Sequence, residues 1–167
     1  MDFALTDEQR AFHDTARDFA PIALIGDGAY VLVAHPSAGM VSSADLIVLA
    51  KSKPGKIAYA SSSIGNLTHL AAELFNSLAG IKMLHVPYKG GNPAMTDLLG
   101  GQLAMVFPTM TLAVPQVKGG KLRALAVTSS GRSGLLPEVP TMIEAGFPEV
   151  NATSWFGLVA PARTPQP

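Results

Sequence analysis

A serine-rich loop, Ser61-Ser62-Ser63-Ile64-Gly65-Asn66, is the part of the sequence best suited to bind an anion. It leads from an expected strand into the first turn of an expected helix. Backbone N–H groups there lack partners within the helix, and the helix dipole favours negative charge. Serine hydroxyls can donate further hydrogen bonds to a carboxylate. The loop therefore predicts an anion-binding site, and the alternative is that these side chains only cap the helix.

Two more loops follow expected strands and could contribute to the same site. In the loop 87–92, Lys89 offers a positive charge and Tyr88 an amphipathic wall, and the alternative is a turn with a solvated lysine. The loop 108–111 contributes Thr109 to the predicted site. Ligands of α/β sheets bind at the carboxyl ends of the strands, so these loops are where a ligand is expected.

The histidines and the absence of cysteine limit the chemistry. Four histidines occur, without metal-ligand spacing: His13, His35, His69 and His85. We expect no metal site, no thiol chemistry and no cofactor. His69, near the start of its helix, is included among the predicted ligand-binding residues. A triad of Ser62, His69 and Asp97 is an alternative, but no oxyanion-hole motif accompanies it, and no catalytic residue is predicted.

Strands alternate with helices along most of the chain, which predicts an α/β fold with a mostly parallel sheet. Strands are predicted at residues 30–34, 57–60, 82–86, 103–107, 122–128 and 155–160. Helices are predicted after Ser42 or Ser43, from the serine loop to Gly80, at 93–99 and at 111–118, with a helical turn at 141–145. In the helix that ends at Gly80, the predicted buried face consists of Leu70, Leu74, Phe75 and Leu78.

Composition excludes some classes of protein. The 12 basic and 12 acidic residues give a formal net charge of zero, and no basic stripe of the kind that binds nucleic acid occurs. Charged residues make up only 14% of the chain. Either part of the surface normally packs against other protein, or this is a neutral α/β protein rich in glycine and proline.

The sequence predicts neither a membrane span nor a signal peptide. A transmembrane helix needs about 18 or more consecutive apolar residues, and no such run occurs. Residues 1–20 contain five acidic residues and lack a basic segment followed by an apolar one. On this ground alone we expect the chain, as written, to stay in the cytoplasm.

Several long motifs resemble the solute receptors of tripartite tricarboxylate transporters, also called Bug receptors. They are PGKIAYASS (54–62), THLAAELF (68–75), HVPYKGGNPAMTDLLGGQ (85–102) and KGGKLRALAVTSSGRSGLLPEVPTMIEAGFPEV (118–150), followed by Trp155, Gly157, Leu158, Ala160 and Pro161. The motifs stand in the family's order. The resemblance extends over residues 18–165.

The resemblance implies one lobe of a periplasmic binding-protein-like (type II) fold that binds a small dicarboxylate or tricarboxylate. It places the family's carboxylate loop on residues 61–66 and the receptor's second lobe on residues 21–161, followed by a proline-rich tail at 162–167. It also implies a periplasmic location and a membrane permease as partner. The family's first lobe and C-terminal helices have no counterpart in this sequence, so a truncated receptor is expected. In the family an aspartate is common where Pro108 stands.

Residues 1–20, MDFALTDEQRAFHDTARDFA, resemble instead the first helix of acyl-CoA dehydrogenases. Thr6 and Gln9 fit a capping box, and Pro21 ends the predicted helix. We expect a helix of foreign origin fused to the receptor lobe. The leading hypothesis is thus a carboxylate-binding receptor that is not an enzyme. The alternatives are a fragment of a flavin-dependent dehydrogenase, a serine hydrolase, or a remnant without function.

Overall fold

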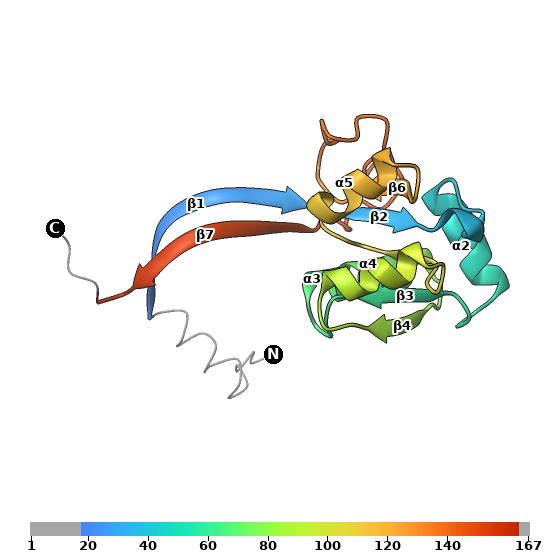
Figure 1. Ribbon diagram of the computed structural model, residues 1–167, viewed down its shortest axis with the longest axis horizontal. Helices are drawn as coiled ribbons and strands as arrows, with labels where there is room; N and C mark the ends of the chain where they lie inside the picture. The colour runs from blue at the N-terminus through green and yellow to red at the C-terminus, as the bar shows by residue number, and fades with distance from the viewer. Residues whose placement is uncertain (1–17, 164–167) are drawn as a thin grey trace, which may run out of the picture. The chain divides into compact units, whose positions relative to one another are not determined.

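The computed structural model describes residues 18–163, and its backbone forms two compact units. The larger is Gly28–Ser154, an α/β body (Figure 1). Its strands are β2 (Val31–Ala34), β3 (Ala58–Ser61), β4 (Leu84–Pro87), β5 (Met105–Val106) and β6 (Arg123–Val127). Its helices are η1 (Pro36–Ala38), α2 (Ser43–Ser52), α3 (Leu67–Ala79), α4 (Gly91–Leu99) and α5 (Met110–Lys118).

The body contains a five-stranded sheet in the order β4-β3-β5-β2-β6. Strand β3 pairs in parallel with β4 and β5, whereas β2 pairs antiparallel with β5 and β6. The sheet is therefore mixed: β2 runs against the other four strands, which share one direction. The predicted α/β class is confirmed. The reversal of β2 is a feature that the sequence analysis did not foresee.

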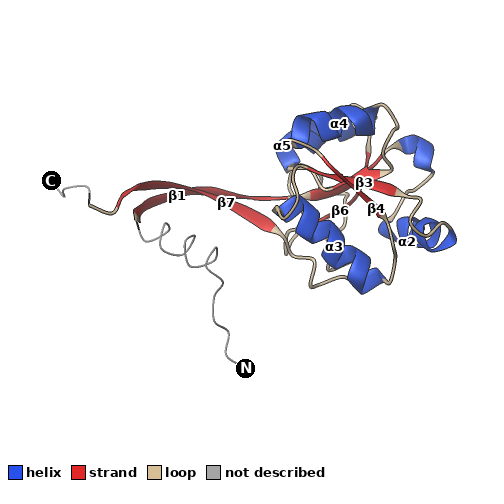
Figure 2. Ribbon diagram, turned by 90° about the horizontal axis from the view of Figure 1, so that it is seen from below, coloured by secondary structure: helices blue, strands red, loops and turns tan. Residues whose placement is uncertain are grey.

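Helices cover both faces of this sheet, and each face has its own hydrophobic core (Figure 2). Side chains of a strand alternate between the faces. In β2, Leu32 joins the core on the side of α2 and α3, while Val31 and Val33 join the core on the side of α4 and α5. All four residues of β2 are fully buried, so this short strand holds the two layers together.

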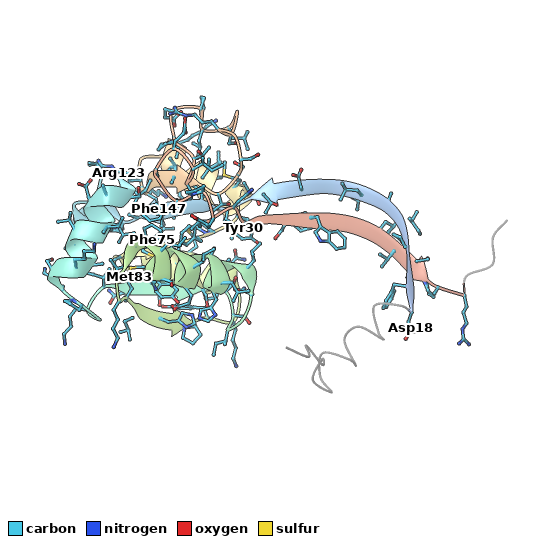
Figure 3. All side chains as sticks on the ribbon, turned by 180° about the vertical axis from the view of Figure 1, so that it is seen from behind. Asp18, Tyr30, Phe75, Met83, Arg123 and Phe147 are labelled. Atoms are coloured by element: carbon cyan, nitrogen blue, oxygen red, sulfur yellow. The ribbon has the colours of Figure 1, made fainter. Side chains whose placement is uncertain are left out.

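Helix α3 buries a different face from the predicted one. Leu70, Leu74 and Leu78 are exposed, and of the predicted stripe only Phe75 is buried. The buried side otherwise consists of small and polar residues: Thr68, Ala71, Ala72 and Asn76. The aromatic contacts of Phe75 fix this orientation. Its ring packs edge-to-face on Phe147 at 5.0 Å and on Phe107 at 6.4 Å. Phe75 and Phe147 are labelled in Figure 3.

The described part of the second unit is a two-stranded ribbon of β1 (Phe19–Ala29) and β7 (Thr153–Pro161), of which residues 28–29 and 153–154 are counted with the larger unit. Phe19 and Ala20, predicted to close a helix, begin β1 instead, and the rest of that predicted helix, residues 1–17, lies outside the described residues. The predicted helical turn at 141–145 is present as a turn in which the Ala145 N–H donates to the Thr141 carbonyl at 3.0 Å, and Thr141 also forms a β-bridge with Val127. Within residues 18–163, no helix is both long and apolar enough to span a membrane.

Candidate functional site

A cavity of about 150 Å³ lies in the α/β body, at the carboxyl ends of β3 and β5. The first residues of three helices reach it: Thr68 of α3, Gly91 of α4, and Thr109, the N-cap of α5. None of the lining residues is charged. They are Tyr30, Ser62, Thr68, Gly91, Ala94, Met95, Val106, Phe107, Pro108, Thr109 and Leu112.

The three helix starts share one electrostatic property. None of them has an acidic residue in its first turn, and α4 and α5 receive no side-chain cap at Gly90 or Thr109. First-turn N–H groups without an acceptor carry partial positive charge. Helix α3 has an uncharged cap, Asn66, and α4 and α5 have no side-chain cap, so the three starts together favour an anion. The cavity can thus bind an anion although no cation lines it.

Gly91 lets α4 begin close to α5. A Cβ atom at this position would lie 2.9 Å from Leu112 Cδ1, which is shorter than side-chain contacts allow. A larger residue would have to displace the Leu112 side chain, itself part of the cavity wall. The glycine therefore shapes the cavity through packing.

The serine loop is held by a hydrogen-bond network centred on Thr68. The Ser62 N–H donates to Thr68 Oγ1 at 3.0 Å, and the Thr68 hydroxyl donates to Asn66 Oδ1 at 2.7 Å. The Asn66 amide donates to Ser62 Oγ at 2.6 Å, and Asn66 Oδ1 also caps α3 by accepting the His69 N–H. The Thr68 hydroxyl hydrogen is used in the hydrogen bond to Asn66, so Thr68 can only accept from Ser62. The Ser62 hydroxyl can therefore donate, either to Thr68 at 3.1 Å or into the cavity.

Of the predicted site residues, the structure brings Ser62 and Thr109 to the cavity. Ser61 is fully buried and donates to the Ser63 carbonyl, and its Oγ lies 2.7 Å from His85 Nε2. Ser63, Ile64 and Gly65 are exposed, and His69 accepts the Gly65 N–H at Nδ1. Asn66 acts through its cap rather than by lining the cavity.

Tyr88 and Lys89, in the second predicted loop, do not line the cavity either. Lys89 is exposed, and the Tyr88 hydroxyl donates to Asp97 Oδ2 at 2.5 Å. That hydrogen bond, followed by burial, raises the pKa of Tyr88 above its usual value. The Gly90 N–H donates to the Ser62 carbonyl at 2.8 Å, so this loop contributes by fixing the serine loop.

Sequence reasoning missed Tyr30, Thr68 and Gly91 as cavity residues. Thr68 stood within a quoted motif, and its place two residues after an N-cap could have identified it. Tyr30 belongs to a distant segment: its hydroxyl bonds Ser154 Oγ at 2.7 Å, and its N–H donates to Thr128 Oγ1. Only the three-dimensional fold brings it to the loop.

The alternative triad is not assembled. Ser62 bonds Thr68 and Asn66, His69 Nδ1 bonds Gly65, and Asp97 accepts from Tyr88. Among residues 18–163, no group of three or more histidine, aspartate or glutamate side chains could hold a metal ion.

Comparison with known proteins places these observations in a family. The model for the "Tripartite tricarboxylate transporter family receptor" matches residues 8–167. Protein BugT of Bordetella pertussis is 42% identical over 147 residues, which are 88% of this chain and 45% of BugT. A protein encoded in a tcbD–tcbE intergenic region of Pseudomonas sp. (strain P51) is 37% identical over 94% of this chain and 47% of its own length.

Solved structures agree with this fold. Rpa4515 of R. palustris, solved with adipate, has a TM-score of 0.85 at 36% identity. The match covers 90% of this chain and 50% of the Rpa4515 chain. MatC (Rpa3494) from Rhodopseudomonas palustris, with bound malate, has a TM-score of 0.80 at 29% identity and covers 88% of this chain and 50% of its own. The periplasmic binding protein BugD has a TM-score of 0.82. The chain spans about half the length of the relatives it matches.

Proposed function

Because the chain belongs to the tripartite tricarboxylate transporter receptor family, we propose that residues 28–154 form a receptor lobe that binds one carboxylate group of a small dicarboxylate. The observation that carries this proposal is the cavity at which α3, α4 and α5 begin without an acidic residue. Backbone N–H groups would bind the carboxylate, together with the hydroxyls of Ser62, Thr68 and Thr109.

The size and lining of the cavity support this assignment. A volume of about 150 Å³ has room for one end of a linear acid. Apolar side chains such as Met95, Val106 and Leu112 would contact the methylene groups. Adipate and malate, bound by relatives that share the fold, are the first ligands to test.

The wider role follows from the family and is part of the same proposal. Together with the remaining part of such a receptor, the lobe would enclose the acid in the periplasm and deliver it to a membrane permease. The receptors in the family are binding proteins, and we assign no catalytic step to this chain.

An NMR titration tests the proposal at the level of single residues. We expect adipate at millimolar concentration, near pH 7.5, to shift the amide signals of Thr68, Gly91 and Thr109. A diamine of equal length, 1,6-diaminohexane, should leave them in place because helix N-termini repel cations. Signals that do not move with adipate or malate, or that move equally with the diamine, would refute the carboxylate site.

Two neighbouring serines offer a matched pair of variants. Ser62 lines the cavity, whereas the exposed Ser63 donates only to the Ile64 carbonyl. We expect Ser62→Ala to weaken adipate binding by about 10-fold, the usual effect of removing a hydrogen bond to a charged group. Ser63→Ala should bind as the unchanged chain does. Equal effects of the two substitutions would argue that the cavity is not the site.

A further inference from the structure

Two histidine rings stack against each other next to the serine loop. His69, on the first turn of α3, and His85, on β4, have ring centroids 4.1 Å apart with an angle of 23° between their planes. The Tyr59 ring also stacks on His85, at 4.9 Å. Tyr59 and His85 are direct partners in the β3–β4 pairing, so the sheet fixes two of the three rings.

Both histidines hydrogen-bond the loop. The Gly65 N–H donates to His69 Nδ1 at 3.1 Å, and Ser61 Oγ lies 2.7 Å from His85 Nε2. A backbone amide can only donate, so Nδ1 of His69 must carry a lone pair, and the ring must be neutral with its proton on Nε2. Protonating Nδ1 would set two N–H donors against each other and end the bond to Gly65.

The surroundings oppose a charge on the second ring as well. Of the titratable groups, Tyr59 of β3 stacks on His85 and Glu73 of α3 acts on its charge, and the Tyr59 hydroxyl donates to Glu73 Oε1. Asn76 also donates to Glu73 Oε1, at 3.3 Å. Burial, and then the neighbouring His69, lower the pKa of His85, while Glu73 acts in the opposite direction.

Neither histidine lines the cavity, yet both bond the loop that supplies Ser62 to it. We propose that the neutral His69–His85 pair positions the serine loop, and that a proton on His69 Nδ1 releases Gly65 and weakens carboxylate binding. The affinity part of this inference rests on the proposed function. His69 is thus a positioning residue.

The loop can be observed without any ligand. In the unliganded full chain, the Gly65 amide signal should shift as the pH falls from about 8 to 5, in step with the ring signals of His69. In His69→Asn the side-chain Oδ1 can accept from Gly65 but cannot be protonated, so the Gly65 signal should become independent of pH. His35→Asn is the control, because His35 bonds Ser37 elsewhere and its loss should leave the Gly65 titration unchanged.

Adipate affinity gives the second readout. We expect binding at pH 5.5 to be about 10-fold weaker than at pH 7.5, the effect of losing one positioning hydrogen bond, and to differ less than about twofold in His69→Asn. A Gly65 signal that does not titrate, or that titrates equally in His69→Asn, overturns the positioning role even if adipate binds. Tighter binding at pH 5.5 overturns the predicted direction. An absence of adipate and malate binding at pH 7.5 refutes the proposed function, while the Gly65 titration still decides the role of His69.

Discussion

Helix α2 and the three helices around the cavity differ in what lies at their first turns. At α2, Asp45 Oδ2 accepts the N–H groups of Val41 and Ser42 and the Ser42 hydroxyl, each at 2.9 Å. The Ser42 hydroxyl in turn caps the Asp45 N–H, completing a capping box. Helices α3, α4 and α5 have no acidic residue in this position.

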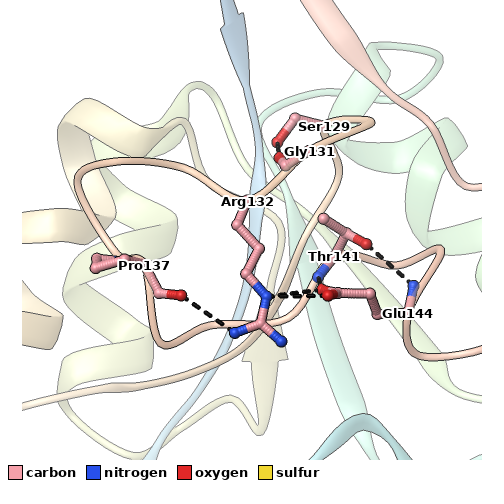
Figure 4. Close-up of polar contacts among 6 residues, drawn as sticks. All are labelled: Ser129, Gly131, Arg132, Pro137, Thr141 and Glu144. Carbon is pink, nitrogen blue, oxygen red and sulfur yellow. Dashed lines mark hydrogen bonds and ion pairs between the residues drawn. The ribbon is translucent and has the colours of Figure 1, made fainter.

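Glu144, in the turn 141–146, is a second carboxylate of the chain that accepts a backbone N–H group in a reciprocal pair of hydrogen bonds. The Thr141 N–H donates to Glu144 Oε2 at 2.7 Å, and the Glu144 N–H donates to Thr141 Oγ1 at 3.0 Å (Figure 4). Arg132 Nε lies 3.0 Å from both carboxylate oxygens. The chain thus places its own carboxylates on N–H groups in two places, and this is the arrangement proposed for an external carboxylate at the cavity.

The largest expected effect comes from giving the cavity a carboxylate of its own. Thr109 occupies the N-cap position of α5 without a side-chain cap bond, and it lines the cavity. Aspartate is favoured at N-cap positions, so Thr109→Asp should fold normally. Its charge would repel adipate and lower the affinity by about 100-fold or more, since opposing like charges cost several kcal/mol. Binding is measured by calorimetry at pH 7.5.

Thr109→Asn is the control for this substitution. It keeps a good N-cap of nearly the same size but adds no charge, so adipate affinity should change only a few-fold. If Thr109→Asp and Thr109→Asn bound adipate equally well, the cavity would not be the carboxylate site.

The second largest expected effect is a loss of folding stability in acid, caused by protonation of Asp45 and Glu144. Hydrogen bonds from Val41 and Ser42 lower the pKa of Asp45, and the hydrogen bond from Arg132, followed by that from the Thr141 N–H, lowers the pKa of Glu144. Their stabilisation is therefore complete above the ordinary pKa values of 3.8 and 4.5 and is lost as the pH falls below them. Urea midpoints from pH 6 to 3 should fall, and the fall should be shallower in Asp45→Asn and in Glu144→Gln.

Asp45→Asn at neutral pH should have a smaller effect. It removes the charge from the capping box, so we expect a melting temperature lower by a few degrees and unchanged adipate affinity. Glu149→Gln is the matched control, because the exposed Glu149 carboxylate makes no hydrogen bond or ion pair within the described residues. An Asp45→Asn chain as stable as Glu149→Gln would contradict the role assigned to the capping box.

The smallest expected effect belongs to Arg132→Gln. The ion pair with Glu144 has side chains 46% and 45% exposed, and such surface pairs contribute little. The melting temperature should fall by about 2 °C or less, and 0.5 M salt should reduce the difference further. A large loss that salt does not change would instead point to the hydrogen bond from Arg132 to the Pro137 carbonyl.

Local signals explain which parts of the fold the sequence predicted. The α/β alternation and the serine loop were found because a strand, a serine-rich turn and a helix start follow one another directly. The direction of β2 was not predictable in this way, since its partners β5 and β6 lie about 70 to 90 residues further along the chain. The buried face of α3 was misjudged because apolar residues occur on two sides, and the distant Phe107 and Phe147 decide between them.

For the candidate site, the structure shows only which of the predicted residues lie at the cavity. The loop itself was located, and Ser62 and Thr109 lie at the cavity. Residues such as Ser61 and His69 are polar and close to it but bond within the protein. Sequence identifies side chains able to bind a carboxylate, but it does not reveal which of their donors the fold has already used.

Three helix starts meeting at one cavity have an evolutionary consequence. Main-chain N–H groups are present whatever the side chain, and the fold sets their positions. Most substitutions in the cavity wall therefore leave them in place. Under the proposed function, replacements at Met95, Val106 or Leu112 would alter the length and shape of the acid accepted while recognition of its carboxylate persists. Such a scaffold can diversify into many receptors for different acids by drift in a few apolar positions.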